Sequence, residues 1–174
     1  MSETIRTLIS REDVEKRIRE LGEQISADYK GREIVLVCIL KGAAFFACEL
    51  AKNLDGGVRM EFMRCSSYGS GDVTSGKVKL LLDLDTDIEG RDVIVVEDII
   101  DTGLTMKYLL ELLSHRKPAS LALAVLLDKP DRRRAEVKAD YTGFSIPDEF
   151  VVGYGLDFDE RYRQLPYIGV VEKS

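Results

Sequence analysis

Residues 93–106 constrain the fold of this chain more than any other stretch, because a short apolar run there meets a cluster of acids. Residues 93–96 read Val-Ile-Val-Val, a composition typical of a strand buried on both faces of a parallel sheet. Glu97, Asp98 and Asp101 follow at once, and apolar residues then recur at helical spacing to position 113. The acids are therefore predicted at the carboxyl edge of a sheet, where open α/β folds bind ligands and a helix start favours anions.

An Asp-Thr-Gly turn before a helix often serves only as a cap and a tight turn. Such a turn accounts for one acid and one threonine of this stretch. It does not account for Glu97 and Asp98, two adjacent acids that follow an apolar strand without an obvious counter-charge. Mg²⁺ or the hydroxyls of a ribose would supply the missing partners. We therefore interpret the stretch as a ligand-binding site.

The run from Glu97 to Thr105, Glu-Asp-Ile-Ile-Asp-Thr-Gly-Leu-Thr, resembles the signature with which type I phosphoribosyltransferases bind 5-phosphoribosyl pyrophosphate (PRPP). Its form resembles the hypoxanthine-guanine branch of that family, and the resemblance extends over nearly the whole chain. It implies that Glu97 and Asp98 hold the ribose hydroxyls, directly or through Mg²⁺, and that Asp101 is the general base. It also implies a cradle for the 5′-phosphate made by Asp101, Thr102, Gly103, Leu104 and Thr105.

Alternating and continuous apolar patterns predict the other elements of the fold. They are a helix over residues 10–29, strands over residues 34–40, 58–65, 77–83, 121–127 and 141–146, a helix from residue 43 to about residue 53, and a helix that follows residue 105 and ends near residues 117–118. Ser10 and Asp13 resemble a capping box at the start of the first helix, which we expect to be structural.

The strand over residues 34–40 leads directly into a Lys-Gly turn. Taken alone, Lys41 and Gly42 fit an ordinary strand-to-helix turn with an exposed lysine. Leu40-Lys41-Gly42 nevertheless resembles the family's pyrophosphate loop, in which the peptide bond before the lysine is an uncommon non-proline cis bond. The resemblance implies that Lys41 and Gly42 bind the leaving pyrophosphate.

Residues 66–76 form a segment too long and too rich in glycine and serine for a tight hairpin. Ser67 and Tyr68 resemble the family's mobile active-site lid, and a plain flexible hairpin loop is the alternative. Residues 71–77 nearly spell a P-loop, but Val78 stands where a serine or threonine would bind Mg²⁺. A strand rather than a helix is also predicted to follow, so we reject the P-loop.

A lysine follows the predicted strand over residues 121–127 at its carboxyl end. Such a lysine is usually solvated, but the run Leu-Leu-Asp-Lys-Pro resembles the family's purine-recognition strand, in which Lys129 would contact the base. The three arginines at residues 132–134 lack interleaved aromatic residues, so we interpret them as a solvated or interface face and not as a nucleic-acid patch.

The C-terminal segment, residues 150–166, resembles the family's hood over the active site. The resemblance implies that Phe150 stacks on the purine, although a core position is the commoner fate of a phenylalanine. It further implies that backbone groups of Val151 read the edge of the base, that Asp157 binds a second metal ion through water, and that Arg163 contacts pyrophosphate.

The composition, 45% hydrophobic and 32% charged over 174 residues with a net charge of −6, describes one globular domain. We expect no signal peptide and no membrane span, and the acidic balance argues against nucleic acid as a partner. Cys38, Cys48 and Cys65 form no Cys-x-x-Cys pair, so reduced thiols and a cytoplasmic location are expected. The single histidine, His115, argues against a histidine-based triad or zinc site.

Together these observations predict an α/β domain with a central, mostly parallel sheet of about five strands flanked by helices. The core is expected over residues 30–145, and a small hood over its carboxyl edge from residues 1–30 and 146–174. The family resemblance implies purine salvage, in which hypoxanthine or guanine and PRPP give IMP or GMP and pyrophosphate with Mg²⁺. It also implies a homodimer or homotetramer.

Three other functions stay open at this point. A related transferase could act on xanthine or on a pyrimidine, and Lys129 and Phe150 disfavour only the pyrimidine. A non-catalytic RNA-binding regulator would conflict with the acidic balance. A nucleotide-binding module without chemistry would not need Asp101 together with Lys41 and Arg163.

Overall fold

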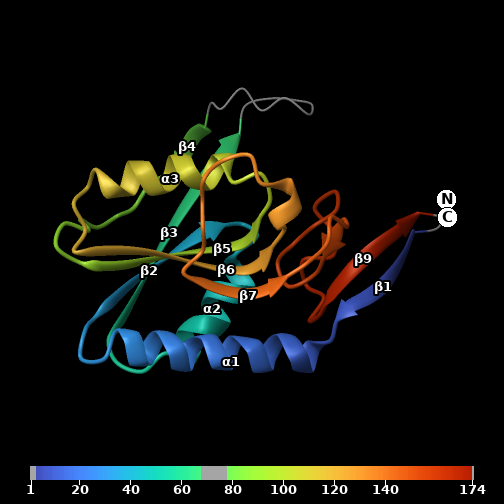
Figure 1. Cartoon of the computed structure of the whole chain (residues 1–174), viewed down its shortest axis with the longest axis horizontal. Coiled ribbons are helices and arrows are strands. Elements are labelled where there is room, and N and C mark those ends of the chain that lie inside the picture. The colour runs from blue at the N-terminus through green and yellow to red at the C-terminus, as the bar shows by residue number, and fades with distance from the viewer. Residues whose placement is uncertain (1–2, 68–77, 174) are drawn as a thin grey trace.

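A central sheet dominates the computed structural model, which describes residues 3–67 and 78–173 (Figure 1). Within these ranges the sheet has six strands, of which five are parallel and β4 pairs antiparallel with β3 at one edge. The order is β4-β3-β2-β5-β6-β7, with β2 at Ile34–Leu40, β3 at Val58–Ser67, β4 at Val78–Leu82, β5 at Asp92–Ile100, β6 at Ser120–Asp128 and β7 at Tyr141–Ser145. The predicted α/β fold is confirmed.

Helices cover both faces of the sheet: α1 (Arg11–Asp28) and α2 (Ala44–Lys52) on one face, and α3 (Leu104–Ser114) on the other (Figure 1). Since side chains alternate along a strand, β2 and β5 contribute to both cores. Leu36 and Ile94 are fully buried on the side of α1 and α2, and Val37 and Val95 are fully buried on the side of α3. The two central strands therefore have no solvated face, as their composition predicts.

A second sheet forms the hood, with antiparallel strands in the order β1-β9-β8. β1 (Glu3–Ile9) comes from the N-terminal segment, and β8 (Val151–Val152) and β9 (Ile168–Lys173) come from the C-terminal segment. β1 and β9 lie side by side beyond the end of α1 (Figure 1). The predicted hood span of residues 1–30 is too wide, because the buried face of α1 belongs to a core of the main sheet.

β5 is longer than predicted and carries the acids on its own last residues. Glu97 and Ile99 remain paired with Val125 and Leu127 of β6, so the strand continues to Ile100. The acidic pair is thus held by a sheet and not by a loop. The helix that follows, α3, ends at Ser114, before the predicted end near residues 117–118.

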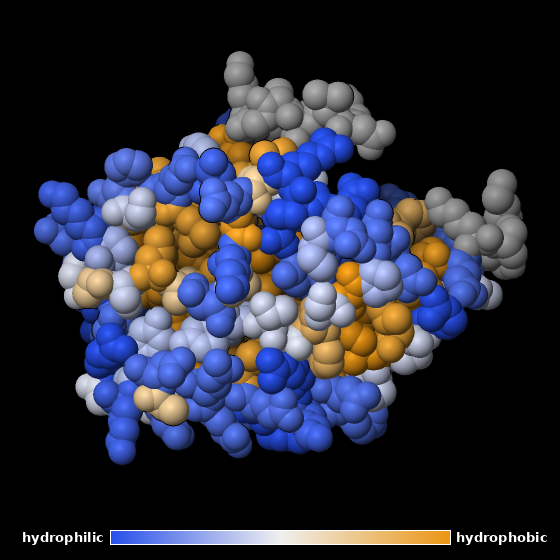
Figure 2. Space-filling view, viewed as in Figure 1, coloured by the Kyte–Doolittle hydropathy of each residue, from blue (hydrophilic) through white to orange (hydrophobic). Residues whose placement is uncertain are grey.

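Hydrophilic residues cover most of the face seen in Figure 2, and apolar surface shows beside α3 and over the hood. The exposed apolar side chains include two aromatic residues that matter below, Phe45 at 46% exposure and Phe150 at 55%. Scattered exposed apolar residues are normal. Two large aromatic side chains near the carboxyl edge of the sheet are candidates for contact with a ligand or a partner.

Candidate active site

A cavity of about 200 Å³ opens at the junction of β5 and α3. Its lining comprises Glu97, Asp98, Ile99, Ile100, Asp101, Thr102, Gly103, Thr105 and Met106. Gly103 adopts a φ of 83° and starts α3, a left-handed conformation that favours glycine. The Thr102 hydroxyl oxygen accepts a hydrogen bond from the Leu104 amide at 3.4 Å. The predicted phosphate loop therefore surrounds a cavity at a helix N-terminus, the position that suits an anion.

Glu97 and Asp98 line this cavity, and the charge of Arg163 only partly offsets the effect of burial on the pKa of Asp98. The Glu97 carboxylate accepts a hydrogen bond from the Asp98 amide at 2.9 Å, and the Asp98 carboxylate accepts one from the Ile99 amide at 2.7 Å. No lysine or arginine in the described ranges forms an ion pair with either carboxylate. Burial, together with the charge of Asp98, raises the pKa of Glu97 well above its ordinary value, and burial raises the pKa of Asp98.

Such a donor set fits Mg²⁺, because that ion prefers hard carboxylate oxygens and usually binds through one or two of them together with substrate oxygens. Across residues 3–67 and 78–173 no group of three or more His, Cys, Asp or Glu side chains is gathered to hold a metal ion. Asp157 therefore does not join Glu97 and Asp98 in one ligand set. A cation bound by the acidic pair would need oxygen ligands from the substrate.

The turn after β2 packs against the acids on one side and the hood on the other. The peptide bond between Leu40 and Lys41 is cis, as the family resemblance implies. A side chain at Gly42 would collide with the Asp98 carboxylate, and one at Gly155 would collide with the Gly42 carbonyl oxygen. The two glycines thus let the turn after β2, the acidic pair and the hood approach one another closely.

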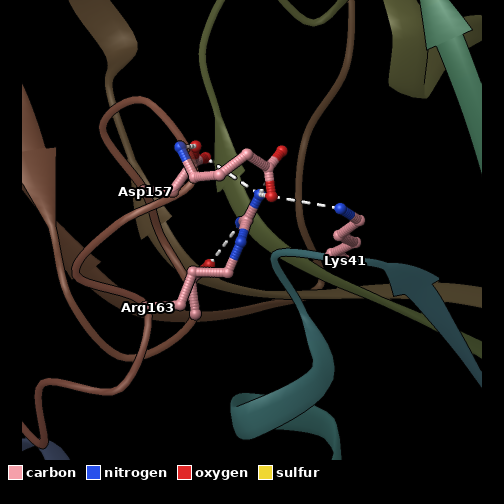
Figure 3. A network of polar contacts seen from close by, with 5 residues as sticks. Lys41, Asp157 and Arg163 are labelled. Carbon is pink, nitrogen blue, oxygen red and sulfur yellow. Dashed lines mark hydrogen bonds and ion pairs between the residues drawn. The ribbon is translucent and has the colours of Figure 1, made fainter.

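Lys41 and Arg163 point toward each other across a polar network near Asp157 (Figure 3). Lys41 Nζ lies 3.0 Å from Glu160 Oε2, and Arg163 Nη2 lies 3.1 Å from Asp157 Oδ1 and 3.4 Å from Glu160 Oε1. Arg163 also donates to the Gly155 carbonyl at 2.7 Å. The hydrogen bond and charge of Lys41 lower the pKa of Glu160. The two predicted pyrophosphate-binding cations are therefore brought together and share one carboxylate.

Residues 129–135, which include the single-turn 3₁₀ helix Pro130–Arg132, clamp the phosphate loop from outside. The Lys129 amide donates to the Ile100 carbonyl at 3.0 Å. The amides of Arg134 and Ala135 both donate to the Thr102 carbonyl, at 2.8 and 3.1 Å. Three backbone hydrogen bonds thus hold the loop that carries Asp101 against this turn.

The interpretation of residues 132–134 as a solvated or interface face is wrong for Arg133, whereas Arg132 and Arg134 are exposed as predicted. Arg133 is only 20% exposed at its side chain, pairs with Asp128 and donates to the Val137 and Asp101 carbonyl oxygens. Arg132 Nε lies 2.7 Å from Asp101 Oδ1. Both side chains hold the loop of the predicted general base, because that loop lies against the turn that carries them.

Among the described residues, Lys129 is the one charged or polar residue that is buried, with 7% of its surface exposed. Its Nζ lies 3.6 Å from Asp148 Oδ1, and Asp148 Oδ2 lies 3.5 Å from Arg132 Nη1. A lysine is rarely buried unless it is paired. The solvated alternative for Lys129 is therefore wrong, and a chain of ion pairs joins it through Asp148 and Arg132 to Asp101.

Phe150 offers its ring at the surface of the hood. It is 55% exposed and meets Phe158 edge-to-face with ring centroids 5.6 Å apart, so the core alternative for this residue is wrong. Val151 is buried and pairs with Val170 of β9. A rigid aromatic beside a fixed strand suits stacking on a planar ligand.

The predicted lid falls largely outside the described residues. Tyr68 lies outside them, and Ser67 is the last residue of β3, where its backbone pairs with Val78. Sequence reasoning assigns no site role to Arg132, Arg133, Asp148 and Glu160, because charged residues in turns are usually solvated. The run of three arginines beside Lys129 was the sequence signal that could have found two of them.

Residues 7–159 match the family model described as the phosphoribosyl transferase domain. The chain therefore belongs to the phosphoribosyl transferase family. The hypoxanthine-guanine phosphoribosyltransferase of Streptococcus thermophilus is 52% identical over 167 residues, which span 96% of this chain and 93% of that protein. The enzyme of the same name from Bacillus subtilis is 50% identical over 169 residues, or 97% of this chain and 94% of the relative.

The fold agrees with solved structures of the same group. A crystal structure of a hypoxanthine phosphoribosyltransferase from Staphylococcus aureus superposes with a TM-score of 0.93 at 48% identity, covering 95% of this chain and 90% of the other. Among the helices that the structure describes, none is long and apolar enough to span a membrane.

Replacing Glu97 by glutamine is expected to raise the free energy of unfolding of the unliganded protein by about 1 kcal/mol at neutral pH. Burial and the charge of Asp98 both destabilise the ionised form of Glu97 and so raise its pKa. Folding therefore opposes its ionisation, so the gain is present at neutral pH and disappears at a pH low enough to protonate Glu97 in both states. Urea denaturation at neutral and acid pH measures the gain. Glu23→Gln on the exposed face of α1 is the control, and an equal gain there would contradict the argument.

Proposed function

We propose that this chain transfers the 5-phosphoribosyl group of PRPP to hypoxanthine or guanine, and that it thereby forms IMP or GMP and pyrophosphate in purine salvage. The observation that carries the proposal is the chain of ion pairs from Lys129 through Asp148 and Arg132 to Asp101. It joins a buried donor for a base to a carboxylate at the mouth of a phosphate cradle. The relatives named above support the same reaction.

Departure of pyrophosphate leaves an electron-poor carbon at C1 of the ribose, so the negative charge of the leaving group must be stabilised. Lys41, the backbone of Gly42 and Arg163 are the groups for this task, because Lys41 and Arg163 contact the same carboxylate, that of Glu160, and Gly42 packs against Gly155 of the hood. Preorganised donors aimed at developing charge usually contribute more to catalysis than any other single effect. The amides and hydroxyls of residues 101–105 would hold the 5′-phosphate at the other end of the ribose.

Glu97 and Asp98 would hold Mg²⁺ together with the ribose hydroxyls, and Asp157 would reach a second ion through water. Mg²⁺ supplies charge stabilisation to the pyrophosphate oxygens when it is bound. These two carboxylates support this assignment, because a bound cation would offset the burial of both charges and their mutual repulsion.

Asp101 would accept the N7 proton of the purine as N9 attacks C1. Arg132 holds one carboxylate oxygen at 2.7 Å, which fixes the direction of the acceptor. Lys129 would donate to the 6-oxo oxygen next to N7, the backbone of Val151 would read the base edge, and Phe150 would stack on the ring. Closure of a lid that includes Ser67 and Tyr68 would exclude water that otherwise hydrolyses the activated ribose.

The proposal extends to a cytoplasmic homodimer or homotetramer. A cavity of about 500 Å³ at the surface between α2 and the hood supports the assembly. It holds the exposed Phe45, whose ring lies 6.4 Å from that of Tyr154, and charged groups of both signs from α1 and α2. Exposed aromatic side chains with charged groups beside them are common in subunit contacts.

The reaction is tested by incubating the protein with PRPP and Mg²⁺ and with each base in turn, and by identifying the nucleotide formed. Hypoxanthine and guanine are expected to give IMP and GMP with one pyrophosphate per nucleotide. Product from xanthine alone would change the assigned base. Absence of any nucleotide with all bases would overturn the proposal.

Replacing Asp101 by asparagine is expected to slow the single-turnover rate about 10²–10⁴-fold, because the shape is kept and the proton acceptor is lost. Binding of PRPP should change little, since the phosphate cradle is built mainly from backbone groups. Rapid-quench kinetics with hypoxanthine measures the rate. Asp131→Asn, an exposed acid in the neighbouring turn, is the matched control and should stay near wild type. A rate for Asp101→Asn near that control would remove Asp101 as the base.

Lys129→Gln is expected to lower kcat/KM for hypoxanthine and to narrow its ratio to adenine. An ammonium has three donors and no acceptor, so it suits a 6-oxo oxygen and rejects the amino group of adenine. Sites built for one hydrogen-bonding pattern discriminate by as much as about 10⁴-fold. The ratio of the two kcat/KM values is compared with that of the exposed control Lys138→Gln. An unchanged ratio would assign the choice of base to the backbone near Val151.

A further inference from the structure

One carboxylate sits where the proposed pyrophosphate site needs an anion. Glu160 Oε2 lies 3.0 Å from Lys41 Nζ, and Glu160 Oε1 lies 3.4 Å from Arg163 Nη2. Lys41 and Arg163 come from segments far apart in the chain, and Glu160 is the group that contacts both cations. A negative charge shared by two cations is also what a bound pyrophosphate would present to them.

We propose that Glu160 is a positioning residue that takes the place of pyrophosphate in the free protein, and that it must leave Lys41 and Arg163 when PRPP or pyrophosphate binds. This inference rests on the proposed function, because it takes the anion to be the leaving group of the phosphoribosyl transfer. Glu160 would then compete with pyrophosphate for Lys41 and Arg163. It would thereby lower the affinity of the site for pyrophosphate.

The backbone around Glu160 suits a side chain that can be exchanged. Phe158 and Arg161 exchange backbone hydrogen bonds at 3.0 Å in both directions, which leaves Asp159 and Glu160 as the two residues of a tight turn. Both have positive φ, 53° and 59°, as the two central residues of a type I′ turn require. The side chain of Glu160 is 66% exposed. It can therefore rotate into solvent while the turn itself stays in place.

Arg163 keeps its position when Glu160 leaves, because other groups hold it. Its Nη1 donates to the Gly155 carbonyl at 2.7 Å, and its Nη2 lies 3.1 Å from Asp157 Oδ1. Asp157 also accepts the Glu160 amide at 2.9 Å and so anchors the turn. Lys41 has no second ion pair within the described ranges. The exchange of anions therefore frees Lys41 for the ligand and leaves Arg163 in a fixed orientation.

The sign of the effect follows from competition. In the wild-type protein an incoming anion must break the contacts of Glu160 before it gains its own. Glu160→Gln keeps the length of the side chain and removes the charge, so pyrophosphate and PRPP should bind roughly three- to tenfold more tightly, the range expected for two exposed ion pairs. The KM for PRPP should fall, and kcat should not rise, because release of pyrophosphate becomes slower.

Asp159→Asn is the matched control, because it removes the same charge from the neighbouring position of the same turn. Asp159 makes no ion pair with the described residues, so a local contact would affect only Glu160→Gln. A change in the general field of the protein would instead affect both variants alike. Glu160→Ala serves as a second variant, and thermal unfolding of all three checks that they remain folded.

Calorimetric titration of inorganic pyrophosphate and of PRPP, each with and without Mg²⁺, tests the inference. The expected result is a lower Kd for Glu160→Gln and Glu160→Ala, with Asp159→Asn within about twofold of wild type. Equal or weaker binding in both Glu160 variants, or an equal gain in Asp159→Asn, would overturn the inference and leave the proposed function intact. Failure of the wild-type protein to bind either ligand would overturn both.

Discussion

The parallel pairing of β5 between β2 and β6 is the interaction on which the site depends. Parallel strands place their carboxyl ends at one edge, and this edge therefore receives the turn with Lys41, the acids of β5 and the lysine that follows β6. Burial of the central strands on both faces fixes their register, since a slip by one residue would exchange the two cores. Leu36 and Ile94 fill one core, and Val37 and Val95 fill the other. Packing of the two cores therefore also fixes where the candidate site residues lie at the end of these strands.

Charge in the free protein is distributed unevenly over this edge. The cations Lys41, Arg163 and Lys129 all have carboxylate partners, whereas Glu97 and Asp98 have no ion-pair partner within the described ranges. The proposed ligand carries both negative and positive charge, because PRPP is a polyanion that would bind together with Mg²⁺. Its binding would replace the carboxylate partners of the cations and supply partners to the acids. The net free energy of binding therefore depends on the ion pairs that must first be broken within the protein.

The sequence predicted the elements that have a strong period or an unbroken apolar run. It placed β2, β6 and α1 within one or two residues, and the motif residues from Glu97 to Thr105 do line one cavity, with the exception of Leu104. It failed where long-range contacts decide. The extension of β5 to Ile100 depends on pairing with β6, and α1 belongs to the main sheet because of its buried face. Arg133 and Glu160 acquire their roles from contacts that only the folded chain brings together, and no local pattern records them.

Pairing of β1 with β9 makes the hood a joint product of both ends of the described chain. During synthesis β1 emerges first and has no partner until β9 follows it, although the main sheet can already form. We therefore expect the nascent domain to form the proposed phosphate cradle before Phe150, Arg163 and the contact of Gly155 with Gly42 are in place. Non-local strand pairing is the slow part of folding. We therefore expect the chain to become compact before it can bind pyrophosphate.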